Sequence, residues 1–514
     1  MKKLWLLFVF AGLLLAQPRP PQPSPYRDAD RKIFAEIEKN NDLLANLEYL
    51  CDMIGPRLTG SDKLKTANQW TLKKLEQYGL EHCRLEPWII GNRWTRGTAR
   101  ARIVEPAALP LTIASAGWAP STNGAVRGRL MYVKADKPAD LDKFKGQLKG
   151  AVVITTEPAR LDQPLGPPPA GPMAPLAPLP VPPAEGAPRP VSALDALAGE
   201  RGREDPNVPF EERMRMRRQM NDFYAKEGVL ALLRDSSKEH GLLNMGGAGG
   251  ANYQIAPIPT AYVIHEDYSR LWRLLEHKHP VEVELDIKNE TAPGPVEVYN
   301  TVAEIGGGEK ASEMVIVGGH LDSWDLGTGT TDNGTGSSVV LEAARAIRAS
   351  GLKPQRTLRF VLFTGEEQGL VGSREYTKLH KDELDRVQGV VIHDTGTGRV
   401  KSFTMEGRYD LREILDKLVE PLRELGMEEL SMRRTGGSDH VPFRDAGVPA
   451  FFGIQDPAEY RKTHHSQTDT FDKVRKNDLI QGAKAVAALA WNLSESPEKL
   501  QRKKIEPPPR PSTQ

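Results

Sequence analysis

Short apolar runs that end in polar residues recur in the second half of the chain. Residues 314–317 are apolar and lead through two glycines to His320, and residues 358–363 lead to the adjacent pair Glu366 and Glu367. Apolar, β-rich runs of this length, separated by a segment with helical spacing, predict parallel strands of an α/β sheet. Ligands of open parallel sheets bind just beyond the carboxyl ends of the strands, so these polar residues are predicted to meet at one edge.

The alternation of strand and helix patterns continues to the end of the chain. It predicts strands at residues 314–319, 357–363, 388–393 and 450–452, and helices at 334–348, 369–380, 410–425 and 477–493. Nearer the N-terminus, apolar positions at helical spacing predict amphipathic helices over 29–53 and 62–78, followed by a strand-rich region from 83 to 106. We therefore predict an α/β fold with a mixed, mainly parallel sheet flanked by helices.

Residues 115–285 differ in character, because short predicted strands alternate with long insertions. Strands are predicted at 128–133, 150–154, 230–233 and 260–264, and a helix with a basic, solvated face over 211–226. Proline recurs at every second or third position of residues 163–190, which predicts an extended mobile loop because proline donates no backbone hydrogen bond. We predict these parts: signal peptide 1–16, disordered linker 17–28, N-terminal part of the main domain 29–114, inserted β-rich domain 115–285, main domain 286–498 and Pro-rich tail 499–514.

Composition and the N-terminus limit the functions that the chain can have. Its 514 residues suffice for two or three domains, and a net charge of +1 gives no electrostatic reason to expect a nucleic-acid partner. Lys2 and Lys3 precede a short apolar stretch that ends at Ala16, which predicts a cleaved signal peptide and a secreted or periplasmic protein free of the membrane; an uncleaved anchor is the alternative. Cys51 and Cys83 could form a disulfide or remain free thiols.

Six residues suit a metal site: His320, Asp332, Glu366, Glu367, Asp394 and His465. Each has an ordinary structural explanation when taken alone, but four of them lie at predicted strand ends of one sheet. Zinc accepts imidazole and carboxylate ligands. Two histidines and three carboxylates suit a pair of zinc ions that share a bridging carboxylate and a hydroxide, and the remaining glutamate would then serve as the base.

Four segments resemble signature stretches of the M28 family of co-catalytic zinc exopeptidases: residues 319–325, 332–334, 366–369 and 464–469. Residues 50–61 also resemble the N-terminal segment of this family. The resemblance implies the zinc exopeptidase fold and two Zn²⁺ per chain. It implies that His320 and Asp394 bind one zinc, that Glu367 and His465 bind the other, and that Asp332 bridges the two. Glu366 would be the general base and acid. Asp322 would orient the imidazole of His320, and the hydroxyl of Tyr460 would lie near the oxyanion.

The resemblance carries several further expectations. The peptide bond between Asp332 and Asn333 should be cis. Many relatives have Asp in place of Asn333, a difference that should not affect the metals. His464 competes with His465 as a ligand, and the family pattern favours His465. A loop with Ser438, Asp439 and His440 is expected to face the substrate. The inserted region resembles a protease-associated (PA) domain, which would cover the cleft and restrict access to short peptides with free ends.

The predicted function is that of an exported di-zinc exopeptidase that hydrolyses dipeptides or short peptides, with a zinc-bridged hydroxide as nucleophile. The motifs report on the metals and not on the peptide terminus that binds. A dipeptidase or carboxypeptidase and an aminopeptidase of the same family therefore remain alternatives. A non-catalytic, receptor-like protein of the same fold is a more distant one. The expected partners are short peptides, and the resemblance allows a homodimer.

Overall fold

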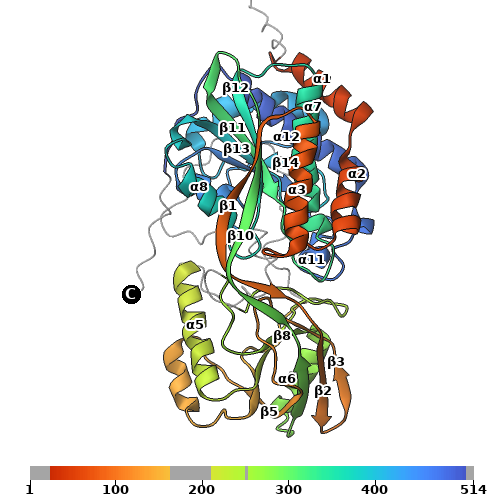
Figure 1. The fold of residues 1–514 in the computed structure, drawn as a ribbon, viewed down its shortest axis with the longest axis vertical. Helices are drawn as coiled ribbons and strands as arrows, with labels where there is room; N and C mark the ends of the chain where they lie inside the picture. Colours follow the sequence, from red (N-terminus) through yellow and green to blue (C-terminus); the bar gives the residue numbers. More distant parts are fainter. Residues whose placement is uncertain (1–23, 162–209, 249–252, 505–514) are drawn as a thin grey trace, which may run out of the picture.

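The computed structural model describes residues 24–161, 210–248 and 253–504, which form two lobes that each contain one sheet (Figure 1). We call the lobe with the seven-stranded sheet the large lobe and the one with the eight-stranded sheet the small lobe. Two long antiparallel strands, β1 (Glu81–Thr95) and β10 (Glu290–Ile305), run from the large lobe toward the small lobe and link them. The predicted signal peptide and the Pro-rich loop 163–190 lie outside the described residues.

The sheet of the large lobe is parallel at its centre and antiparallel toward its edges. Its strand order is β1, β10, β12 (Arg356–Phe363), β11 (Lys310–His320), β13 (Val387–Ile392), β15 (Ala450–Gln455) and β14 (Val400–Phe403). The neighbours β12, β11, β13 and β15 pair in parallel, whereas β1, β10 and β14 join by antiparallel pairing. The prediction of a mixed, mainly parallel sheet is therefore confirmed, with the parallel pairing in the four central strands.

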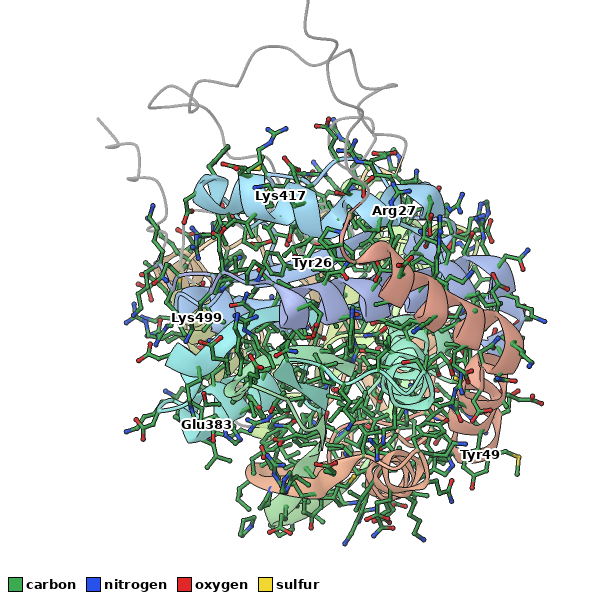
Figure 2. The ribbon with its side chains drawn as sticks, turned by 90° about the horizontal axis from the view of Figure 1, so that it is seen from above. Tyr26, Arg27, Tyr49, Glu383, Lys417 and Lys499 are labelled. Carbon is green, nitrogen blue, oxygen red and sulfur yellow. The ribbon has the colours of Figure 1, made fainter. Side chains whose placement is uncertain are left out.

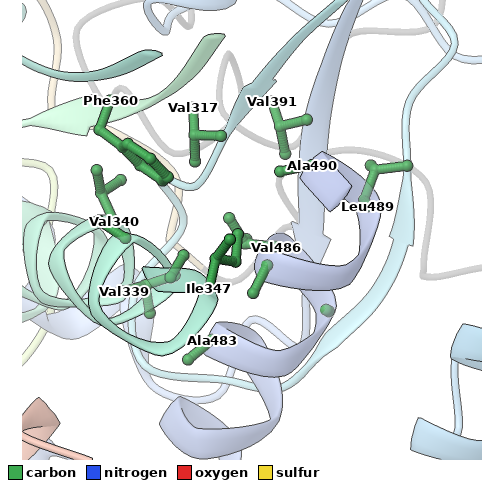
Figure 3. Packing of buried hydrophobic residues seen from close by; sticks show 14 of the residues in the cluster. Val317, Val339, Val340, Ile347, Phe360, Val391, Ala483, Val486, Leu489 and Ala490 are labelled. Carbon is green, nitrogen blue, oxygen red and sulfur yellow. The ribbon is translucent and has the colours of Figure 1, made fainter. Parts of the chain in front are cut away.

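Helices cover both faces of this sheet, which explains why its central strands are continuous apolar runs. Val315 and Val317 of β11 pack on one face, while Met314 and Ile316 pack on the other. The first face is covered by α1 (Arg27–Asn40), α2 (Leu43–Glu48), α3 (Asp62–Gln77), α7 (Thr335–Ala349), α9 (Arg412–Val419) and α12 (Lys476–Glu495). The second is covered by α8 (Val371–Leu379) and α10 (His440–Asp445). Figure 3 shows Val317 and Val391 facing the side chains of α7 and α12.

Two predicted segment boundaries of the large lobe are wrong. Helix α1 begins at Arg27 (Figure 2), inside the predicted linker 17–28. An ion pair of 2.5 Å joins Arg27 in its first turn to Glu420. Residues 499–504 of the predicted tail pack on the lobe, because Leu500 is buried and the main-chain amide of Lys503 donates to Gly447. The predicted helix 29–53 is divided into α1, α2 and a π-helical segment, Tyr49–Ile54.

Within its described residues, the small lobe consists of a mixed sheet with two α-helices, α5 (Phe210–Lys226) and α6 (His265–Glu276). Its strand order is β3 (Leu109–Leu111), β2 (Ala99–Glu105), β9 (Glu282–Ile287), β5 (Val126–Tyr132), β6 (Ala151–Ile154), β7 (Ala231–Asp235), β8 (Thr260–Val263) and β4 (Ile113–Ser115). The sheet thus begins at Ala99, earlier than the predicted boundary at residue 115, since β2 pairs with both β3 and β9. Within the described ranges, no helix has the combined length and apolar character needed to traverse a bilayer.

Candidate metal centre

The parallel strands of the large lobe bring the predicted metal ligands together. His320 is the last residue of β11, Glu367 follows β12, and Asp394 follows β13. Because β11 lies between β12 and β13 in the sheet, the three strand ends meet at one edge. Asp332 comes from the turn that precedes α7, and His465 follows the short helix α11 (Tyr460–Thr463). All five predicted ligands therefore converge, although more than 140 positions separate the first from the last.

Asp332 lies between the two histidines. One of its oxygens, Oδ1, is 3.2 Å from His320 Nε2, and the other, Oδ2, is 3.4 Å from His465 Nε2. His320 Nε2 also lies 3.1 Å from Asp394 Oδ1, and His465 Nε2 lies 2.8 Å from Glu367 Oε2. The residues thus form two groups, one His and one carboxylate on either side of a shared aspartate, as the resemblance implies.

The hydrogen bond of the His320 ring indicates which of its nitrogens could bind a metal ion. Its Nδ1 is 3.0 Å from the main-chain oxygen of Asp322, and since a carbonyl can only accept, Nδ1 carries the proton. Without a second proton, the lone pair of Nε2 would face the carboxylates of Asp332 and Asp394, so this nitrogen needs either a proton or a cation between it and the carboxylates. Burial lowers the pKa of His320, but the carboxylates of Asp394 and Glu366 outweigh it and raise this pKa well above its usual value.

Two buried carboxylate oxygens give a second, independent indication of a cation. Although His465 approaches both, Asp332 Oδ2 and Glu367 Oε2 accept no well-aligned hydrogen bond from the described residues. Unpaired buried acceptors are costly unless a cation satisfies them. Imidazole and carboxylate together are the donor set of zinc. The residues present therefore fit the implied metal.

Glu366 lies beside the two groups of predicted ligands and belongs to neither. Its Oε2 is 3.9 Å from His320 Nε2, farther than the oxygens of Asp332 and Asp394. Burial raises the pKa of Glu366 well above its usual value, and the charge of His320 opposes the shift. A carboxylate that is close to the centre but not among its nearest ligands has the position that a general base requires.

Asp322 contacts the glutamate pair in addition to the His320 imidazole that it was predicted to orient. Its main-chain carbonyl accepts from the His320 imidazole, whereas its carboxylate is 3.6 Å from Nδ1 of that ring. The carboxylate accepts instead from the main-chain amides of Glu366 and Glu367, over 3.3 and 3.4 Å, and from the hydroxyl of Thr59 over 2.9 Å. Asp322 therefore fixes the glutamate pair as well as the imidazole.

A second aspartate fixes the turn that carries Asp332. The carboxylate of Asp469 accepts from the main-chain amides of Thr331 and Asp332, over 2.5 and 3.2 Å. The peptide bond between Asp332 and Asn333 is cis, as predicted. The side chain of Asn333 donates to the main-chain oxygen of His393 and accepts from the amide of Gly336, so it does not face the metal centre.

The two adjacent histidines differ in their distances to the carboxylates. Their rings stack with centroids 3.7 Å apart. His464 Nε2 is 3.8 Å from Asp332 Oδ2, whereas His465 Nε2 is 3.4 Å from the same oxygen and 2.8 Å from Glu367 Oε2. His464 also belongs to a group of side chains that could hold an ion together with Asp332 and His465. The distances favour His465 as the ligand.

Tyr460 and the loop with Ser438, Asp439 and His440 are all buried. Tyr460 is buried next to His464, with ring centroids 5.1 Å apart, and its pKa is raised by burial and by the carboxylate of Asp332. The hydroxyl of Ser438 donates to Asp394 Oδ2 over 2.5 Å, so this loop contacts a predicted metal ligand. His440 is wholly buried and contacts Thr435.

Sequence reasoning missed the residues that the small lobe contributes. The main-chain amide of Met245 donates to the main-chain oxygen of His465 over 2.7 Å, and Lys238 Nζ donates to that of Arg461 over 2.5 Å. The aromatic ring of Tyr253 is buried near Glu366 and Asp322, whose charges act on its hydroxyl. No sequence pattern connects these residues with positions more than 100 residues away. Cys51 and Cys83 are both free thiols.

A small cavity opens beside the centre on the side of His465. Its walls are formed by Trp324, Gly327, Gly329, Asp332, Glu367, His465, Ser466 and Asp469. The ring of Trp324 meets that of His465 edge to face, with centroids 5.9 Å apart. The cavity thus reaches three predicted ligands, Asp332, Glu367 and His465, and polar and aromatic groups share its lining.

Comparisons with known proteins agree with this geometry. Residues 300–490 match the model of peptidase family M28. The chain is 28% identical to carboxypeptidase Q of Homo sapiens over 460 residues, which cover 89% of this chain and 86% of that protein. Its fold is similar to that of a peptidase M28 precursor from Shewanella amazonensis, with a TM-score of 0.71, 25% identity and coverage of 95% and 99% of the two chains.

A zinc aminopeptidase from Bacillus subtilis shares the fold, with a TM-score of 0.59 at 18% identity over 93% of this chain and 98% of that one. The family match spans β10 to α12 and thus includes every predicted metal ligand. The chain is therefore a metallopeptidase whose residues 300–490 match peptidase family M28, and it is similar to carboxypeptidase Q over most of its length.

Proposed function

We propose that the protein is an exported exopeptidase that binds two zinc ions and hydrolyses dipeptides or short peptides with free ends. The single observation that carries the proposal is the position of Asp332, with one oxygen facing His320 and Asp394 and the other facing His465 and Glu367. An aspartate shared in this way suits a pair of metal ions rather than one. The names of the similar proteins, a carboxypeptidase and a zinc aminopeptidase, support the reaction class and the metal.

In this proposal the side chains have separate roles in metal binding and catalysis. His320 and Asp394 would hold one zinc, His465 and Glu367 the other, and Asp332 both. When bound, zinc ions lower the pKa of water and polarise the carbonyl of the peptide bond. The carboxylate of Glu366 takes the proton of the attacking water and passes it to the nitrogen of the leaving amine. The hydroxyl of Tyr460 would donate to the oxyanion.

The small lobe supports the restriction to short substrates. Its residues 238–245 bond to the segment that carries His465, through the contacts of Lys238 and Met245 described above and through Gln467, which bonds with Gly241 and Leu243. A second lobe packed next to the centre leaves little room for a folded protein chain. The resemblance of this lobe to a PA domain and the predicted signal peptide of residues 1–16 remain part of the proposal.

Chelation and zinc restoration test the proposal directly. Treatment with a strong chelator should abolish turnover of a dipeptide, and added zinc should restore it. The peptide terminus is tested with three forms of one short peptide: free, blocked at the N-terminus and amidated at the C-terminus. Loss of activity only with the amide indicates a carboxypeptidase, loss only with the N-blocked form indicates an aminopeptidase, and loss with both indicates a dipeptidase. Turnover that the chelator leaves unchanged would contradict the proposal.

A further inference from the structure

Lys238 places a buried cation next to the metal centre. It follows strand β7 of the small lobe and is only 4% exposed. Its Nζ donates a 2.5 Å hydrogen bond to the main-chain oxygen of Arg461 in α11, the helix that precedes His464 and His465. The ammonium group therefore lies on the side of the centre that carries the ligand His465.

This ammonium group has no anionic partner in the described part of the chain. No carboxylate described there lies within 4 Å of Nζ, and only one of its three N–H donors is used. The neighbouring Glu239 pairs instead with the guanidinium of Arg461, over 3.1 Å. A buried charge without a partner is costly, and proteins keep one where a ligand supplies the opposite charge.

The electrostatic neighbours of Lys238 show how near the centre it lies. Burial and the charge of Arg461 lower the pKa of Lys238 to about 8, against the opposing carboxylates of Glu239, Asp332 and Asp469. In the other direction, burial and also the charge of Lys238 lower the pKa of His465. Lys238 thus interacts with the shared aspartate and with one predicted ligand, from outside the set of ligands.

We propose that Lys238 binds the free α-carboxylate of a short peptide and selects the C-terminal peptide bond for cleavage. The proposal rests on the proposed exopeptidase function. In a C-terminal residue, the carboxylate carbon is two bonds from the nitrogen of the last peptide bond, a distance of about 2.5 Å. A cation that binds this carboxylate must therefore lie close to the metal centre, and the bond of Lys238 to Arg461 places its ammonium group on the side of the centre that carries His465. The free end next to the bond that an aminopeptidase cuts is an ammonium group, which a lysine at this place repels.

The test compares a dipeptide with its C-terminal amide in the zinc-loaded, full-length protein. In Lys238→Met, kcat/KM for the free dipeptide should fall about 100-fold, mainly through KM, because a desolvated charge pair is lost. The value for the amide should change less than threefold. Lys238→Arg should retain more activity toward the free dipeptide than Lys238→Met. Arg461→Gln is the matched control, since it removes a nearby charge that is already paired with Glu239, and it should leave the preference unchanged.

Several outcomes would overturn the proposal. An equal loss for both substrates would show that Lys238 supports the His465 segment or the oxyanion rather than the substrate. A wild-type enzyme that cleaves both substrates equally well would exclude a carboxylate anchor. A Lys238 effect on amides that have an acidic side chain would assign the lysine to that side chain instead. If Lys238→Met fails to fold, judged by zinc content and circular dichroism, Lys238→Gln provides a neutral donor for the same comparison. If the zinc-loaded wild type cleaves neither substrate, the proposed function itself fails.

Discussion

The main-chain amide of Glu366 donates a 3.3 Å hydrogen bond to the carboxylate of Asp322. These residues belong to different loops, one after β11 and the other after β12, and the amide of Glu367 donates to the same carboxylate. One aspartate therefore fixes the neighbouring loop that supplies both the proposed base and a proposed ligand. The position of Glu366 Oε2, 3.9 Å from His320 Nε2, depends on this contact.

Replacing Asp322 should displace both Glu366 and Glu367, although Asp322 is not itself a predicted metal ligand. Asp322→Asn presents an amide with only one acceptor oxygen to three donors, so we expect a 10- to 100-fold loss of both zinc affinity and kcat/KM. Thr59→Val is the matched control, because it removes only the third donor and should cost less than tenfold. Zinc titration and dipeptide kinetics measure both quantities. An Asp322→Asn enzyme with wild-type zinc affinity would show that the contact is dispensable.

The adjacent glutamates should respond differently to the same substitution. Glu366→Gln removes the proposed base, so kcat should fall by about 10²- to 10⁴-fold while two zinc ions remain bound. Glu367→Gln removes a proposed ligand, so it should lower the zinc content. Elemental analysis of both variants after dialysis, combined with kinetics, distinguishes these outcomes. Loss of zinc from Glu366→Gln with retention in Glu367→Gln would mean that we have exchanged the two roles.

His465 and His464 provide a second matched pair. His465→Ala should lose about one zinc ion per chain, because its Nε2 is the imidazole nitrogen nearest to Glu367. His464→Ala should retain two ions, although loss of the ring stacked on His465 is expected to weaken binding moderately. Isothermal titration with zinc gives the number of sites in each variant. A reduced number in His464→Ala alone would assign the ligand to His464.

A buried acid far from the metals should make stability depend on pH. Burial raises the pKa of Asp30 to about 7, opposed by a hydrogen bond from Asn492 in α12. The folded state thus binds a proton more tightly than the unfolded chain, whose Asp pKa is about 3.9. Stability from this group is full below pH 4 and is lost as the pH rises toward 7.

The variant Asp30→Asn should lack this dependence. Between pH 5 and pH 7, the free energy of unfolding of the wild type should fall by roughly 2 kcal/mol relative to that of the variant. Denaturant unfolding at several pH values, with both proteins saturated with zinc, measures the difference. Parallel curves for the two proteins would show that Asp30 ionises normally in the folded state.

Much of the large lobe could be predicted from the sequence, because its buried strands are continuous apolar runs. The predicted strand 357–363 corresponds to β12, and the predicted helix 477–493 corresponds to α12. The antiparallel strand β10 was missed, since its first half is exposed and contains two prolines. The start of the small lobe was placed too late because β2 pairs with β9, which lies nearly 180 residues further along the chain. Pairing between strands so far apart in the sequence produces no pattern within either segment from which it could be predicted.

The metal centre was predictable for a different reason. Its residues follow strand ends, and a resemblance assigned their roles, so His320, Asp332 and His465 could be named before any geometry was known. The contribution of the small lobe could not. Lys238 has the sequence context of a surface lysine, and only the folded chain shows that it is buried beside His465. The same holds for Ser438, whose contact with Asp394 depends on two distant loops.

Anomalous X-ray scattering from crystals of the zinc-loaded protein, recorded above and below the zinc absorption edge, tests the central claim most directly. We predict two zinc peaks per chain, one bound by His320 and Asp394 and the other by His465 and Glu367, with Asp332 touching both. A crystal that shows no zinc at these side chains, or zinc bound only elsewhere on the chain, would contradict the account.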